Sequence, residues 1–175
     1  SIFTKYNLEV TAPKVVQTLS VEELCKIVPE HDGWIIGDDP ATQEVFEAGK
    51  KGNLIGAVKW GIGVDNVDFQ ACKDLNIPII NTPNMFGGEV ADIAVGYVIG
   101  LARETFNIHE EVKKGDWPKP RGISLDGKTA AIIGLGDIGL SLAKRLLSMG
   151  MKIIGYDPSI KISDEYKGKI QHLVW

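Results

Sequence analysis

A glycine-rich hexapeptide, Gly-Leu-Gly-Asp-Ile-Gly at residues 134–139, has the clearest chemical meaning in this sequence. A strand-like apolar run, residues 129–133, precedes it, and a helical pattern of apolar residues follows as far as Met149. A second strand-like run, residues 151–156, then ends at Asp157. This order of strand, glycine turn, helix, strand and acid is typical of a βαβ unit that binds a dinucleotide.

Each part of this fingerprint has a physical role. Gly134 allows the tight turn out of the strand, Gly136 lets the backbone approach a pyrophosphate, and Gly139 lets the helix pack closely on the strand. The free N–H groups at the start of the helix, at Asp137 and Ile138, offer partial positive charge to the phosphates. We therefore expect these residues to bind the coenzyme; the alternative is a glycine-rich turn that binds no ligand.

The acid at the end of the second strand indicates which coenzyme is bound. The Asp157 carboxylate can accept hydrogen bonds from both hydroxyls of an adenosine ribose. A 2′-phosphate would meet its negative charge, so the sequence predicts NAD rather than NADP.

Composition excludes several other classes of function. The chain has 175 residues, a net charge of −4 and no basic cluster, so nucleic acid is not an expected partner. The most apolar run, residues 93–102, is about half of the roughly 20 residues that a membrane span needs, and no secretory signal opens the sequence. Cys25 and Cys72 fall in expected helices as reduced thiols, and we expect a cytoplasmic protein without a metal site.

The first half of the chain alternates strand and helix signals, which predicts a parallel sheet covered by helices. The expected strands lie at residues 8–10, 34–36, 54–59 and 77–80, and the expected helices at 21–28, 40–48 and 68–75. A capping box, Ser20 to Glu23, marks the start of the first helix.

A longer helix is expected from Glu89 to Val112 and is apolar on nearly every side. Gly96 and Gly100 lie four residues apart on one face, so another element could approach closely there. Both a core helix within one subunit and a subunit interface fit this pattern, and we expect a homodimer through residues 89–112. The sheet of the second unit is expected to stop after two strands, where a Rossmann sheet has about six. The natural protein is therefore expected to extend further at both ends.

Several further segments share their order and spacing with one enzyme family. They are Lys59-Trp60-Gly61-Ile62-Gly63-Val64-Asp65-Asn66-Val67-Asp68, Ile77-Pro78-Ile79-Ile80-Asn81-Thr82-Pro83, Glu89-Val90-Ala91-Asp92, Gly115-Asp116-Trp117, Asp126-Gly127-Lys128-Thr129 and Gly155-Tyr156-Asp157-Pro158. Together with the fingerprint, they resemble the D-isomer-specific 2-hydroxyacid dehydrogenases, near the phosphoglycerate dehydrogenase-like branch.

The resemblance implies an α/β fold of two Rossmann-like lobes with parallel sheets and a cleft between them. Residues 1–82 would form part of a flavodoxin-like substrate lobe, and residues 83–175 an NAD-binding Rossmann lobe that is incomplete in this chain. In the family, the backbone N–H groups of the loop Gly61, Ile62, Gly63 and Val64 help to hold the substrate carboxylate, and Ile62 would also lie near the nicotinamide.

The reaction implied is hydride transfer between NAD(H) and the C2 carbon of a D-2-hydroxy acid or 2-keto acid. The Arg, Glu and His that serve this chemistry in the family belong to positions after Trp175, so no catalytic residue is assigned. The histidines (His31, His109 and His172) do not match the family's catalytic histidine, and Arg121-Gly122 precedes the fingerprint, where the catalytic Arg-Gly pair would follow it. The alternatives are an NAD-sensing scaffold of the corepressor type without turnover, and a stand-alone paralogue without chemistry.

One departure from the family concerns the substrate. Phosphoglycerate-specific members often carry Arg-Ser after the strand that ends here at Ile36, whereas this chain has Gly37-Asp38-Asp39. The missing cation weakens the case for a phosphorylated substrate. The two aspartates are expected to cap the following helix.

Overall fold

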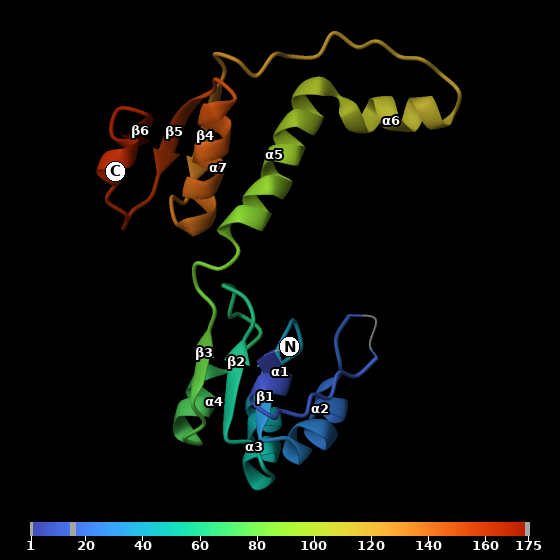
Figure 1. The fold of residues 1–175 in the computed structure, drawn as a ribbon, viewed down its shortest axis with the longest axis vertical. Coiled ribbons are helices and arrows are strands. Elements are labelled where there is room, and N and C mark those ends of the chain that lie inside the picture. Colours follow the sequence, from blue (N-terminus) through green and yellow to red (C-terminus); the bar gives the residue numbers. More distant parts are fainter. Residues whose placement is uncertain (1, 15–16, 174–175) are drawn as a thin grey trace. The chain divides into compact units, whose positions relative to one another are not determined.

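The computed structural model describes residues 2–14 and 17–173. The chain divides into two compact units, Ser1–Pro83 and Asn84–Trp175, each built on its own parallel sheet (Figure 1). The predicted α/β fold class with two parallel sheets is confirmed. The division lies one residue from the one that we expected from the sequence.

The first unit contains a parallel sheet with the strand order β1-β2-β3. The strands are β1 (Gly33–Ile36), β2 (Gly56–Lys59) and β3 (Ile79–Asn81), and the helices are α1 (Ile2–Lys5), α2 (Val21–Ile27), η1 (Val28–Glu30), α3 (Gln43–Lys51) and α4 (Phe69–Asp74). The strand expected at residues 8–10 is wrong, because these residues lie in an exposed loop after α1. A single apolar pair flanking one glutamate does not supply a buried face for a strand.

Local signals explain where these helices begin. The capping box at α2 is present, with the Ser20 side chain accepting from the Glu23 N–H and Glu23 accepting from the Ser20 N–H. Asp68 caps α4 by accepting from the Ala71 N–H at 2.9 Å. A core that includes Phe46 and Ile36 then holds the helices against the sheet.

The second unit has a parallel sheet with the order β4-β5-β6. Its elements are α5 (Gly87–Arg103), α6 (Thr105–Lys113), β4 (Thr129–Ile133), α7 (Asp137–Ser148), β5 (Lys152–Tyr156), η2 (Asp164–Tyr166) and β6 (Ile170–Leu173). The expectation that this sheet stops after its second strand is wrong, since β6 pairs with β5. Ile170 is buried in the same core as Ile153, which provides the burial that a third strand needs.

The long helix expected at residues 89–112 is two helices. Glu104 adopts a left-handed conformation (φ 55°, ψ 31°) that ends α5, and α6 starts at the next residue. The chain turns there, so that a Cβ on Gly100 would overlap the Phe106 ring of α6. Gly100 thus accommodates a side chain of its own unit, whereas Gly96 faces open space.

The expectation that this helix is buried on nearly every side is also wrong. Ala91 is buried, and Val95 and Val98 pack against the core of the second unit. Tyr97 and Leu101 are exposed. Helix α5 therefore has one face packed on the core of its unit and one apolar face exposed to solvent.

No helix in the described part of the chain is both long and apolar enough to cross a membrane. The residues that the structure describes also contain no group of three or more metal-ligating side chains.

Candidate functional site

The glycine fingerprint forms the turn between β4 and α7. Gly134 has a φ of +90°, a conformation that favours glycine, and its N–H donates to the Tyr156 carbonyl at the end of β5 over 2.8 Å. Gly136 is the N-cap of α7 and provides no side-chain cap. The N–H groups of the first turn are therefore available to an anion, as a dinucleotide site requires.

The three glycines differ in how much space surrounds them. A Cβ on Gly139 would overlap the Gly134 carbonyl oxygen, so only glycine lets α7 start this close to the turn. A Cβ on Gly136 would meet nothing within 4 Å. The space beside Gly136 is thus open to a ligand, and the space beside Gly139 is filled by the protein itself.

Asp157, at the carboxyl end of β5, is hydrogen-bonded to the fingerprint. Its Oδ2 accepts from the Leu135 N–H at 2.9 Å, and its Oδ1 accepts from the N–H groups of Ser159 and Ile160 at 2.9 and 3.0 Å. Donation from the Ser159 backbone, then from the Leu135 backbone, lowers the pKa of the Asp157 carboxyl to about 2. The carboxylate therefore stays charged at neutral pH and is fixed on the turn. Its bond to Leu135 was not predicted from the sequence.

A second pair of glycines, Gly87 and Gly88, contributes to the same unit and was missed by sequence reasoning. A Cβ on Gly87 would overlap the Asp137 carboxylate, and one on Gly88 would lie 3.6 Å from the Arg145 guanidinium. Arg145 in turn binds Asp92 of α5, with Nε and Oδ1 2.6 Å apart. Two adjacent glycines at a helix start were the available signal for this close packing of α5 on α7.

The loop Gly61–Val64 follows β2 in the first unit, and residues after β3 hold it. The Gly61 N–H donates to Thr82 Oγ1 at 2.9 Å, and the Thr82 N–H donates back to the Gly61 carbonyl at 3.2 Å. The N–H groups of Ile62, Gly63 and Val64 have no acceptor within the described residues. The loop is thus fixed at its start and presents free backbone donors, which is the arrangement that a carboxylate needs.

Lys59 lies at the end of β2, and it is the buried charged residue of the described chain, with 4% of its surface exposed. Its Nζ donates to the Gly37 carbonyl and lies 3.5 Å from Asp38 Oδ1. The amide of Asn66 also donates to Gly37, at 3.0 Å, and to the Asp39 carbonyl at 2.8 Å. Two donors therefore hold the turn after β1 beside the turn after β2.

The expectation that Asp38 and Asp39 cap the next helix is wrong. Asp38 faces Lys59, and Asp39 Oδ1 accepts from the Leu19 N–H at 2.8 Å. Helix α3 starts later, with Thr42 at its N-cap and no side-chain cap. The aspartates serve a buried lysine and a distant segment, so local sequence could not reveal their partners.

The three histidines lie outside both loops. His31 Nδ1 lies 2.9 Å from the carbonyl oxygen four residues earlier, and His109 is exposed beside a glutamate on α6. His172 is half-buried on β6, and its Nε2 has no partner among the described residues. Arg121 is exposed in the loop before β4. Neither cysteine forms a disulfide, and burial raises the pKa of the Cys72 thiol to about 11.

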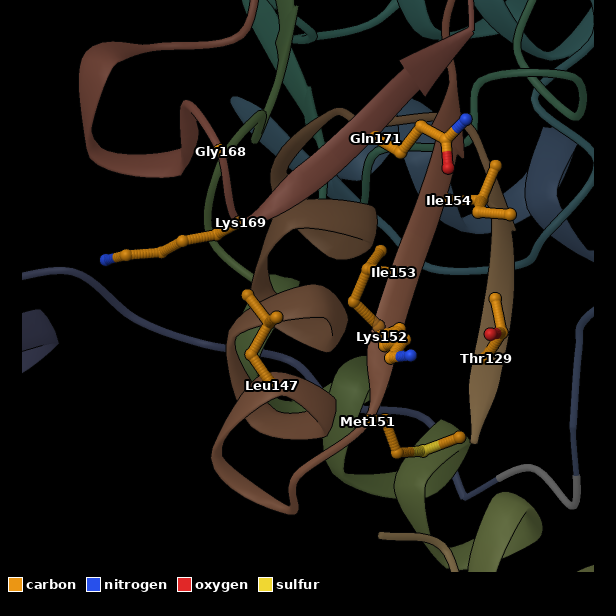
Figure 2. A pocket seen from close by; sticks show the side chains of 9 residues that line it. All are labelled: Thr129, Leu147, Met151, Lys152, Ile153, Ile154, Gly168, Lys169 and Gln171. Atoms are coloured by element: carbon orange, nitrogen blue, oxygen red, sulfur yellow. The ribbon is translucent and has the colours of Figure 1, made fainter. Parts of the chain in front are cut away.

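A separate open hollow of about 430 Å³ lies in the second unit (Figure 2). Its walls include Thr129 and Lys152, the first residues of β4 and β5, so it lies at the amino ends of the strands. The fingerprint follows the carboxyl end of β4. Because ligands of such sheets bind beyond the carboxyl ends, this hollow is not part of the coenzyme site.

Comparison with known families adds independent evidence. Residues 95–173 match the "D-isomer specific 2-hydroxyacid dehydrogenase, NAD binding domain". Hydroxypyruvate reductase of Thermotoga maritima is 39% identical over 161 residues, which are 90% of this chain and 51% of that protein. D-3-phosphoglycerate dehydrogenase of Methanocaldococcus jannaschii is 36% identical over 155 residues, which are 87% of this chain and 29% of that protein. The chain thus spans about half the length of the reductase, or less than a third of the dehydrogenase.

Solved structures agree with this assignment. The TT0316 protein of Thermus thermophilus superposes with a TM-score of 0.85 and 26% identity, covering 99% of this chain and 55% of that one. The NAD+-bound 3-phosphoglycerate dehydrogenase of Entamoeba histolytica gives a TM-score of 0.71 and 26% identity, covering 95% and 47%. Residues 95–173, most of the second unit, therefore carry the NAD-binding domain of the D-isomer specific 2-hydroxyacid dehydrogenases, for which NAD is the coenzyme.

Proposed function

We propose that the whole protein transfers a hydride between NAD(H) and the C2 carbon of a D-2-hydroxy acid or its 2-keto acid. The observation that carries this proposal is the fingerprint geometry: Gly139 packs on the Gly134 carbonyl, and Asp157 is bound to the Leu135 N–H beside open space at Gly136. NAD supplies the hydride, and the protein supplies binding and orientation. In this proposal Gly134, Gly136, Asp137, Ile138, Gly139 and Asp157 bind the coenzyme.

The substrate carboxylate is assigned to the loop Gly61–Val64. Its free N–H groups give charge-assisted hydrogen bonds without adding a group that titrates. Ile62, which is half exposed, would contact the nicotinamide ring. Apart from Ile62, the residues that we assign to the acid lie in the first unit and those that we assign to the coenzyme lie in the second.

We further propose that the substrate is a small acid without a phosphate. Lys59 is a cation that contacts the turn after β1, and its charge already faces Asp38 while its Nζ donates to the Gly37 carbonyl. A lysine engaged in this way has little capacity left for a second anion. The similarity to a hydroxypyruvate reductase supports hydroxypyruvate as one candidate.

Oxidation of NADH, followed at 340 nm as a loss of absorbance, tests the proposal. The whole protein should reduce hydroxypyruvate or glyoxylate in preference to phosphohydroxypyruvate. Residues 1–175 alone should bind NADH yet turn over at least about 10²-fold more slowly, because no arginine or histidine is assigned to polarise the carbonyl. Failure of the whole protein to reduce any small 2-keto acid would contradict the proposal.

The second candidate is an NAD-sensing scaffold of the corepressor type. The fingerprint is compatible with this function, because it concerns the coenzyme and not the acid. The free N–H donors of the loop Gly61–Val64, which we assign to an acid, favour the dehydrogenase. A sensor would bind NAD(H) with no turnover and would change its partner affinity with the NAD to NADH ratio. Turnover of a 2-keto acid separates the two candidates.

Asp157 should select NAD over NADP. Replacing Asp157 with alanine removes the acceptor for the ribose hydroxyls and the charge that repels a 2′-phosphate, so we expect NAD affinity to fall about 10-fold and NADP affinity to rise. Coenzyme affinities measured by fluorescence titration check this. Equal affinity of the unchanged protein for both coenzymes would contradict it.

We also propose that the exposed face of α5 pairs with a second copy of the chain. Its apolar residues Val90, Ile93, Tyr97 and Leu101 recur at helical spacing and are exposed. Changing Leu101 to glutamate should give monomers in analytical ultracentrifugation, while Ile55→Glu, at an exposed apolar position of the first unit, should not. Gly100 cannot serve in this test, because a side chain there would overlap Phe106. A monomeric unchanged protein would refute the interface.

A further inference from the structure

Asp137 places a negative charge at the start of two helices of the second unit. It is the first residue of α7, and its carboxylate lies against Gly87, the first residue of α5. A Cβ built on Gly87 would lie 2.5 Å from Asp137 Oδ2 and closer still to Oδ1, so the carboxylate occupies the position where a side chain of α5 would start. Figure 1 shows α5 and α7 side by side.

The charge is held there without a cationic partner. No lysine, arginine or histidine among the described residues forms an ion pair with Asp137, and Arg145, the basic residue of the last turn of α7, is bound to Asp92. The positive ends of α5 and α7 both face this one carboxylate. The carboxylate therefore stabilises the N-termini of both helices. It also offsets the positive potential that these N-termini would otherwise present to an anion.

We propose that the Asp137 side chain opposes the pyrophosphate of the coenzyme, while the Asp137 backbone binds it. This inference rests on the proposed coenzyme site. The phosphates would bind the free N–H groups of the first turn of α7, and the carboxylate belongs to a residue of that same turn. Two like charges at one helix N-terminus repel each other, and the packing against Gly87 restrains the carboxylate. Asp137 thus sets coenzyme affinity below the value that the N–H donors alone would give.

The test compares two ligands that differ in their phosphates. ADP-ribose contains the pyrophosphate, and adenosine lacks it. For Asp137→Asn, isothermal titration should show about 3- to 10-fold tighter binding of ADP-ribose at low ionic strength, with adenosine affinity unchanged. The gain should shrink as salt is added, because mobile ions screen the repulsion in the unchanged protein. A merely structural role of Asp137 would not produce this dependence on ligand and salt.

Asp126 provides a matched control. Its carboxylate lies against Gly150, two residues after the end of α7. Asp126 is in the turn that precedes β4, at the amino end of that strand, whereas the fingerprint follows its carboxyl end. Asp126→Asn removes the same charge and should leave ADP-ribose affinity within about 2-fold. Unfolding curves of all three proteins show whether each variant is folded at the titration temperature, and Asp137→Ser serves as the second variant if the asparagine protein is unstable.

Each outcome decides the inference. Unchanged or weaker ADP-ribose binding in Asp137→Asn would overturn it, and weaker binding would assign the carboxylate an attractive role. Equal gains in Asp137→Asn and Asp126→Asn would also overturn it, because net charge alone would then account for the effect. If no form bound ADP-ribose, the proposed coenzyme site would be contradicted, and this inference with it. Absence of hydride transfer would contradict the proposed reaction but not this inference.

Discussion

Replacing Gly139 with alanine is expected to lower the free energy of unfolding by about 3 kcal/mol and to remove measurable coenzyme binding. The new Cβ would overlap the Gly134 carbonyl oxygen and lie 2.9 Å from the Gly134 carbonyl carbon, so the turn or the helix must move. Gly134 cannot easily adjust, because its φ of +90° is already confined to glycine. Chemical denaturation and NADH fluorescence titration measure the two effects.

Gly136→Ala is the control that separates folding from binding. Its Cβ would meet nothing within 4 Å, and its φ of −70° suits any residue, so the unfolding free energy should change by less than about 1 kcal/mol. Coenzyme affinity should still fall about 10-fold or more, because the methyl group occupies the space that the pyrophosphate approaches. A stable Gly139→Ala protein with normal affinity would show that the turn is more adaptable than its packing indicates.

The local elements of this fold were predictable because their signals are local. The capping box at Ser20 and the run from β4 through α7 to β5 each depend on neighbours a few residues apart. The third strand, β6, was missed because it has four residues and is stabilised by burial of Ile170 in a core formed by distant segments. Its short apolar pattern alone does not distinguish a strand from a loop.

The break between α5 and α6 shows the same limit in another form. Glu104 is an ordinary helix-forming residue, yet it takes the left-handed conformation that ends α5. Tertiary contacts stabilise this conformation, because the turn brings the Phe106 ring over Gly100 and its centroid within 6.3 Å of the Tyr97 ring centroid. Propensity could not reveal this contact.

Within the candidate site, residue types were more predictable than residue partners. That Asp157 faces a ribose stays a prediction. The structure shows that its carboxylate binds the Leu135 N–H and the backbone of the turn that follows it. Lys59 begins one of the segments that carry the family resemblance, but no role was predicted for it, because surface lysines are common and its acceptor, the Gly37 carbonyl, is 22 residues away. Partners so far apart in sequence can be identified only from the structure, because it is the pairing of the strands that brings them together.

The second large effect is expected from a larger side chain in the loop Gly61–Val64, which we assign to the substrate carboxylate. Changing Gly63 to valine should lower kcat/KM for hydroxypyruvate about 10²-fold, equivalent to about 2.7 kcal/mol, while the affinity for NADH changes by less than about 2-fold. Gly63 has no left-handed φ, and its Cβ would lie 3.5 Å from Asp65 Oδ1, an ordinary contact, so the variant should fold. The branched side chain would instead occupy space that we assign to the substrate carboxylate, beside free N–H donors whose role depends on close approach.

Gly63→Ala is the graded control, and it should lose less, about 10-fold, because one methyl group displaces the carboxylate by a smaller distance. Steady-state kinetics with saturating NADH measure kcat and KM for the keto acid, and a denaturation curve checks the fold of each variant. If both variants reduced hydroxypyruvate like the unchanged protein, the loop Gly61–Val64 would not hold the carboxylate. The fingerprint would then still bind NAD, since it belongs to the other unit, and the acid would have to be held by groups other than this loop.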